Sequence, residues 1–147
     1  MRITKTFKKN REKVAIVGLG YVGLPLILKF IKSQKYDVIG IDQDKKKIKS
    51  LKKGKSYISH ISNSEINLIR QNTIDITWKL SVIKSCNFII FALPTPITKN
   101  KDPDMSYIDT ALNSSKNFLK KNQLVVLEST VYPGATEEFF LKIFKER

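Results

Sequence analysis

Cysteine, histidine and tryptophan are nearly missing from this sequence, which contains one residue of each in 147. With Cys86 as the single cysteine, no disulfide can form within the chain, and this favours a reducing, cytoplasmic setting. The scarcity of cysteine and histidine also leaves no cluster of side chains at metal-binding spacing. We therefore predict a domain that is held together by its apolar core and contains no metal site.

Acidic residues and long apolar runs are scarce as well. The chain has 13 Asp and Glu against 27 Lys and Arg, for a formal net charge of +14. Such a surplus attracts polyanions, but the lysines are spread over every polar segment and no nucleic-acid-binding motif accompanies them. The uncharged segment 14–28 contains 15 residues, fewer than the ~20 of a membrane-spanning helix. We predict neither a nucleic-acid partner nor a membrane anchor.

Apolar residues recur in a pattern that predicts alternating strands and helices. Short β-branched runs predict strands at 14–17, 38–41, 74–76 and 124–127, and the apolar run 88–93 predicts a parallel strand covered on both faces. Helical spacing predicts helices at 22–31, 45–53, 65–70, 106–119 and 136–145. Asp44 is the expected N-cap of the second helix, and Ser106 to Asp109 has the form of a capping box.

This alternation predicts an α/β fold, a doubly wound parallel sheet with helices on both faces. At this length we expect one domain over residues 13–147, preceded by a basic flexible tail at 1–12.

Three glycines, spaced as Gly18-x-Gly20-x-x-Gly23, join the first predicted strand to the first predicted helix. In a dinucleotide-binding Rossmann fold the first glycine makes a tight turn, the second lets the backbone approach a pyrophosphate, and the third lets helix and strand pack closely. The pyrophosphate would lie on the N–H groups at the start of the helix. The context of the motif therefore predicts a Rossmann fold with a dinucleotide site.

Asp42 ends the next predicted strand, 19 residues after Gly23. A carboxylate at this distance can accept hydrogen bonds from the adenosine ribose, and it repels the 2′-phosphate of NADP. The lysines at 45–47 favour NADP instead. Cations at the start of a helix oppose its dipole unless they meet an anion. We predict NAD as the cofactor.

Two further segments follow predicted strands at the edge where open α/β sheets bind ligands. They are Leu93-Pro94-Thr95-Pro96 and Glu128-Ser129-Thr130. From spacing alone, a ligand-binding loop and an ordinary turn are equally good interpretations of each.

Taken together in this order and spacing, VGLGYVGLPL, the Ala-Leu-Pro-Thr-Pro loop and Glu-Ser-Thr-Val-Tyr-Pro-Gly-Ala-Thr-Glu-Glu resemble the UDP-glucose/GDP-mannose dehydrogenase family. The likeness runs from about Lys13 to the end of the chain. Pro-Thr-Pro-Ile-Thr with Pro103-Asp104 downstream, the segment 53–58, and Glu128 before Ser-Thr are most similar to the UDP-N-acetylglucosamine 6-dehydrogenase branch.

The resemblance implies two successive NAD-dependent oxidations, which convert the C6 alcohol of a UDP-sugar to a carboxylate for polysaccharide biosynthesis in a cytoplasmic homo-oligomer. By position, the adenosine half of NAD is assigned to Gly18, Leu19, Gly20, Tyr21, Val22, Gly23, Asp42 and Lys47. Pro94 and Thr95 would line the cofactor cleft. Ser129, Thr130 and Val131 would border the nicotinamide, with Thr130 as the candidate catalytic residue.

The same resemblance implies that the nucleophilic cysteine, the catalytic lysine and asparagine, and most sugar contacts lie after Arg147 in a longer protein. We expect Cys86 to be a small core residue, His60 to lie on the surface, and Trp78 to serve packing. The chain alone is expected to bind NAD without turnover. Two alternatives stay open, namely a 3-hydroxyacid-type dehydrogenase with the same front end and a non-catalytic module that binds a nucleotide or a polyanion.

Overall fold

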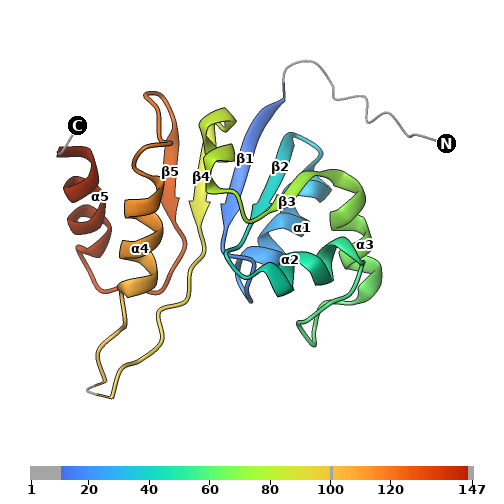
Figure 1. The fold of residues 1–147 in the computed structure, drawn as a ribbon, viewed down its shortest axis with the longest axis horizontal. Helices are drawn as coiled ribbons and strands as arrows, with labels where there is room; N and C mark the ends of the chain where they lie inside the picture. Colours follow the sequence, from blue (N-terminus) through green and yellow to red (C-terminus); the bar gives the residue numbers. More distant parts are fainter. Residues whose placement is uncertain (1–10, 100, 146–147) are drawn as a thin grey trace.

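The computed structural model describes residues 11–99 and 101–145. Five parallel strands form one sheet in the order β3-β2-β1-β4-β5 (Figure 1). The strands are β1 (Glu12–Val17), β2 (Tyr36–Ile41), β3 (Thr73–Thr77), β4 (Phe88–Phe91) and β5 (Leu124–Leu127). Of the predicted basic tail, residues 1–10 lie outside the described residues, and Glu12 already belongs to β1.

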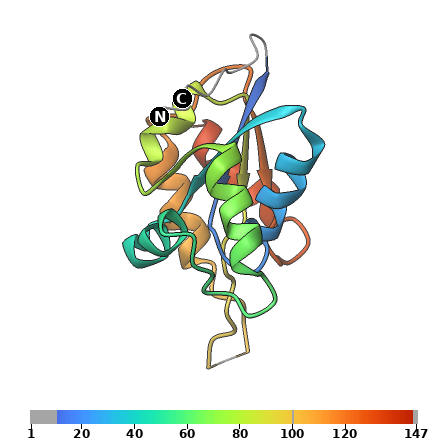
Figure 2. The same ribbon diagram turned by 90° about the vertical axis from the view of Figure 1, so that its right-hand side faces the viewer.

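Helices cover both faces of the sheet, which confirms the predicted doubly wound α/β fold (Figure 2). Alternate residues of β1 explain this arrangement, because successive side chains of a strand point to opposite faces. Val14 and Ile16 pack with α1 (Gly23–Ser33) and α3 (Asn63–Asn72). Ala15 and Val17 pack with the 3₁₀ helix η1 (Leu80–Ser85) and α4 (Ser106–Ser115).

The remaining helices are α2 (Lys45–Lys52), which contacts α3 and β3, and α5 (Ala135–Lys145), which contacts α4. The predicted N-cap of α2 is confirmed, since the Asp44 carboxylate accepts a hydrogen bond from the Lys46 N–H at 2.7 Å.

Helix ends account for two differences from the prediction. The predicted capping box at Ser106 is wrong: Met105 is the N-cap of α4, and Asp104 accepts the Ser106 N–H at 3.0 Å. A capping box instead begins α3, where Ser62 and Glu65 bond each other's backbone N–H groups, and α3 extends beyond the predicted 65–70 at both ends.

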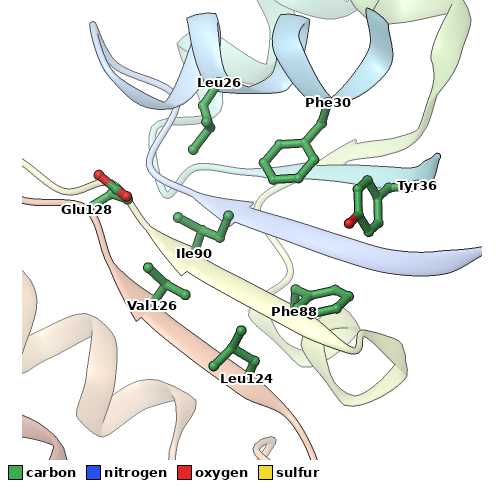
Figure 3. Close-up of a pocket in the computed structure, with 8 residues that line it drawn as sticks. All are labelled: Leu26, Phe30, Tyr36, Phe88, Ile90, Leu124, Val126 and Glu128. Atoms are coloured by element: carbon green, nitrogen blue, oxygen red, sulfur yellow. The ribbon is translucent and has the colours of Figure 1, made fainter. Parts of the chain in front are cut away.

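An apolar groove opens on the α1 side of β4 and β5 (Figure 3). Leu26 and Phe30 of α1 form one wall, and alternate residues of the two strands form the floor. Leu124, at the outer edge, is 55% exposed. Parallel sheets are normally covered on both faces, so the groove marks a part of the sheet that another protein segment could cover.

Candidate cofactor-binding site

The loop from Gly18 to Gly23 connects β1 to α1 at the carboxyl edge of the sheet. Gly18 has a φ of +97°, and its N–H donates to the Ile41 carbonyl oxygen at 2.8 Å. A Cβ atom at Gly18 would collide with the Ala92 carbonyl, and one at Gly23 would collide with the carbonyl of Gly18. The first and third glycines are therefore required by the tight turn and by close packing, as predicted.

Gly20 differs from these two glycines, because a Cβ atom added there would meet nothing within 4 Å. The open space lies beside the start of α1, which has no side-chain cap and no acidic residue in its first turn. An anion placed there would face the positive end of the helix dipole. The backbone at Gly20 thus fits the close approach of a pyrophosphate.

The side chains between the glycines of the loop differ in burial. The Leu19 side chain is fully buried, while Tyr21 is 71% exposed and Val22 is also exposed. The Tyr21 ring lies 5.6 Å from the ring of His60, measured between centroids. His60 is on the surface, as predicted, and this contact joins the loop to the segment between α2 and α3.

Asp42 comes directly after β2 and is 6% exposed. Its Oδ2 accepts hydrogen bonds from the Leu19 N–H at 2.9 Å and from Lys47 Nζ at 3.1 Å. Its Oδ1 accepts the Asp44 N–H at 2.8 Å. The carboxylate is thus fixed between the glycine loop and the start of α2, where sequence spacing placed the ribose site.

Tyr57 is a residue of this site that the sequence motifs did not single out. Its hydroxyl donates to the Leu19 carbonyl oxygen at 2.6 Å, and Lys47 Nζ lies 5.9 Å from the centroid of its ring. Burial and the negative charges of Asp42 and Asp44 raise the pKa of Tyr57, which keeps its hydroxyl protonated and able to donate. The signal in the sequence was the family-like segment 53–58, but the contact spans 38 residues.

The segments after β4 and β5 meet beside the glycine loop. The Ser129 hydroxyl accepts the Leu93 N–H at 3.1 Å and donates to the Leu93 carbonyl at 2.9 Å. The Thr95 hydroxyl donates to the Thr130 carbonyl at 2.8 Å. Leu93 would also lie 3.1 Å from a Cβ atom at Gly18. The structure thus brings both predicted loops to the edge that holds the glycine loop, with Pro94 and Thr130 exposed and Val131 partly buried.

Cys86 and Trp78 were predicted to lie outside the site. Cys86 is buried in the core just before β4, at the opposite end of that strand, and burial raises the pKa of its thiol. Trp78 differs from Cys86 in burial, and its role in packing stays a prediction. Trp78 is 48% exposed and belongs to neither apolar cluster. It follows β3 at the same edge of the sheet as the glycine loop.

Within the described ranges 11–99 and 101–145, no helix is long and apolar enough to span a membrane. Over the same residues no three His, Cys, Asp or Glu side chains are grouped as metal ligands would be.

A glycine loop between β1 and α1, an acidic residue after β2 and the order β3-β2-β1-β4-β5 together define a Rossmann-type dinucleotide-binding domain. The sequence model of the UDP-glucose/GDP-mannose dehydrogenase family, NAD binding domain, matches residues 12–147. The chain belongs to this family, and NAD is the cofactor of its domain. The family match also decides against the 3-hydroxyacid-type alternative.

Named relatives agree with this assignment. The UDP-N-acetyl-D-glucosamine 6-dehydrogenase of Salmonella typhi is 43% identical over 90% of this chain and 30% of the relative. The enzyme of the same name from Pseudomonas aeruginosa is 41% identical over 86% of this chain and 29% of the relative. The structure of UDP-D-ManNAc dehydrogenase from Pyrococcus horikoshii superposes with a TM-score of 0.78 and 30% identity, over 90% of this chain and 32% of that one. The chain spans about 30% of the length of the curated relatives.

Proposed function

We propose that this chain is the NAD-binding part of a longer nucleotide-sugar 6-dehydrogenase. The whole enzyme would oxidise the C6 alcohol of a UDP-sugar, either a UDP-N-acetylhexosamine or UDP-glucose, to the uronic acid for polysaccharide biosynthesis. The observation that carries the proposal is the open backbone at Gly20 beside the fixed Asp42 carboxylate, in a chain 43% identical to a UDP-N-acetyl-D-glucosamine 6-dehydrogenase.

The residues of the adenosine half divide into two groups in this proposal. The backbone from Gly18 to Gly23 holds the pyrophosphate, with Tyr21 and Val22 at its exposed rim. Asp42 accepts hydrogen bonds from the ribose hydroxyls, and Lys47, which is 3.1 Å from Asp42, completes the polar wall. Tyr57 positions the loop through the Leu19 carbonyl.

The nicotinamide half would lie over the ends of β4 and β5. NAD, when bound, supplies the hydride acceptor for the oxidation. Ser129 and Thr95 use their hydroxyls to tie the two strand ends together, so we assign them a positioning role along with Pro94. Thr130 is exposed at this edge, next to the partly buried Val131, and is the residue of this chain proposed to reach the reaction centre.

The remainder of the enzyme is assigned to protein outside this chain. Two observations support this, namely that the chain spans about 30% of its curated relatives and that an apolar groove lies open beside β4 and β5. We propose that the groove receives the catalytic part, which supplies the main catalytic residues and most sugar contacts. A cytoplasmic homo-oligomer without a membrane or nucleic-acid partner is the corresponding proposal for the complete enzyme.

Calorimetric titration of the chain with NAD and NADP tests the cofactor site, and NADH absorbance with UDP-sugars tests turnover. We expect binding of NAD in preference to NADP and no oxidation of UDP-N-acetylglucosamine or UDP-glucose. The variant Gly20→Ala should keep the thermal midpoint of the parent chain, since its methyl group meets nothing within 4 Å. It should weaken NAD binding by about tenfold or more, because the methyl group enters the space that the pyrophosphate approaches.

The absence of heat with NAD would overturn the proposed cofactor site. Unchanged NAD affinity in Gly20→Ala would refute the assigned position of the pyrophosphate, and oxidation of a UDP-sugar by this chain would refute the assignment of the chemistry to the missing part.

A further inference from the structure

Trp78 is the single tryptophan of the chain and lies directly after β3 at the carboxyl edge of the sheet. An indole ring is among the side chains that gain most from burial, yet this one is 48% exposed. It belongs to neither apolar cluster, so the exposed half of its surface is open to a ligand.

The position of Trp78 is tied to the proposed ribose site. The Asp42 N–H donates to the carbonyl oxygen of Thr77, the residue before Trp78, at 3.1 Å. Since β3, β2 and β1 are neighbours in that order, their carboxyl ends place Trp78, Asp42 and the glycine loop side by side along one edge. Neighbouring strands lie about 4.8 Å apart, so this row is about 10 Å long.

This row matches the order of groups in an adenosine phosphate. With the phosphates at the glycine loop and the ribose at Asp42, a base that continues along the row reaches the end of β3. There the base meets Trp78.

Lys45 lies over the indole ring. Its Nζ lies 5.5 Å from the centroid of the Trp78 ring, within the range of a cation–π contact. Lys45 is the first residue of α2, so its backbone is set by the helix that also carries Lys47. A ring held in this way, with half its surface still exposed, offers a stacking platform to a purine.

We propose that Trp78 binds the adenine ring of the cofactor by stacking, with Lys45 holding the indole in place. This inference rests on the proposed function, because it adds the base to the same site. It also gives a role to Lys45, one of the three lysines that do not suit the start of α2.

Tryptophan fluorescence tests the proposal directly, because all of the emission comes from residue 78. The chain is titrated with NAD, ADP-ribose and nicotinamide mononucleotide, with excitation at the red edge of the indole band and correction for absorption. We expect NAD and ADP-ribose, which contain adenine, to change the emission with the dissociation constants that calorimetry gives. Nicotinamide mononucleotide, which has no adenine, should leave the emission unchanged.

Substitutions give a second readout. Trp78→Ala should weaken NAD binding by about 5- to 150-fold, the range for losing one base stacked on an aromatic side chain. Trp78→Phe, which keeps an aromatic ring, should recover most of the affinity. Leu141→Ala is the control, since it removes an exposed apolar side chain of α5, a helix that contacts α4 and lies beyond β5, far from β3 (Figure 1).

The outcomes separate this inference from the proposed function. If calorimetry detects NAD binding while the emission stays constant and Trp78→Ala binds as the parent does, the stacking proposal is overturned and the NAD site stands. If the parent chain binds no NAD at all, both are overturned. If Trp78→Ala does not fold, the fluorescence titration of the parent chain still decides.

Discussion

Replacing Asp42 with asparagine should change both the stability of the domain and its choice of cofactor. The carboxylate accepts three donors in the structure, namely the N–H groups of Leu19 and Asp44 and the ammonium group of Lys47. An asparagine side chain keeps one oxygen and replaces the other by NH₂, which is a donor. Whichever way the amide is turned, at least one N–H at this buried position loses its acceptor.

The size of the stability loss follows from these contacts. A buried donor left without an acceptor costs about 1–3 kcal/mol. The ion pair with Lys47, whose side chain is 35% exposed, adds less than about 1 kcal/mol. We therefore expect Asp42→Asn to lower the free energy of unfolding by about 1–4 kcal/mol.

Cofactor choice should shift in the same variant. Hydrogen bonds from the ribose hydroxyls to a charged acceptor contribute about 1.5–3 kcal/mol, so NAD binding should weaken by about 10- to 100-fold. NADP should lose less or gain, because the charge that repels its 2′-phosphate is gone. The ratio of the two affinities should fall by about tenfold or more.

Urea denaturation and calorimetric titration with both cofactors measure these effects. Asp44→Asn is the matched control, because it removes the same charge two residues away and asparagine is an equally good N-cap. An unchanged ratio of NAD to NADP affinity in Asp42→Asn, or an equal shift in Asp44→Asn, would refute the assignment of Asp42 to the ribose.

Two further predictions concern groups outside the cofactor contacts. Burial raises the pKa of the Cys86 thiol, so the folded chain should react with a thiol reagent at pH 8 far more slowly than the chain in urea. The variant Cys86→Ala should bind NAD as the parent chain does. Fast reaction of the native thiol, or loss of NAD affinity in the variant, would contradict the core role of Cys86. Hydrogen bonds from Ser62 hold the pKa of Glu65 below its usual value. The ionised Glu65 side chain therefore stabilises the folded state above the ordinary pKa of glutamate, and this contribution is lost as the pH falls through the folded-state pKa. Glu65→Gln, which can form the same capping box, should make the urea midpoint fall less steeply as the pH is lowered. Parallel curves of urea midpoint against pH for parent and variant would show that the Glu65 charge contributes nothing to the pH dependence of stability.

Much of the fold was predictable because its signals are local. The runs 14–17 and 124–127 became β1 and β5 because β-branched residues suit a pleated strand, buried in β1 and half-buried in most of β5. The capping box of Ser62 and Glu65 was also present in the sequence, three residues apart, and could have been recognised there. The box predicted at Ser106 failed because Asp104 competes for the same N–H group.

The glycine loop and the acidic residue after β2 follow from the sequence alone, since parallel strands end at one edge and the chain spacing brings Gly18 and Asp42 together. The distant side chains around this loop could be identified from the three-dimensional packing alone. Tyr57 forms a hydrogen bond with Leu19 across 38 residues, and Ser129 forms two with Leu93 across 36. Lys45, at the start of α2, lies over the ring of Trp78. Such contacts depend on how loops pack over the sheet edge, and no periodicity in the chain encodes that packing.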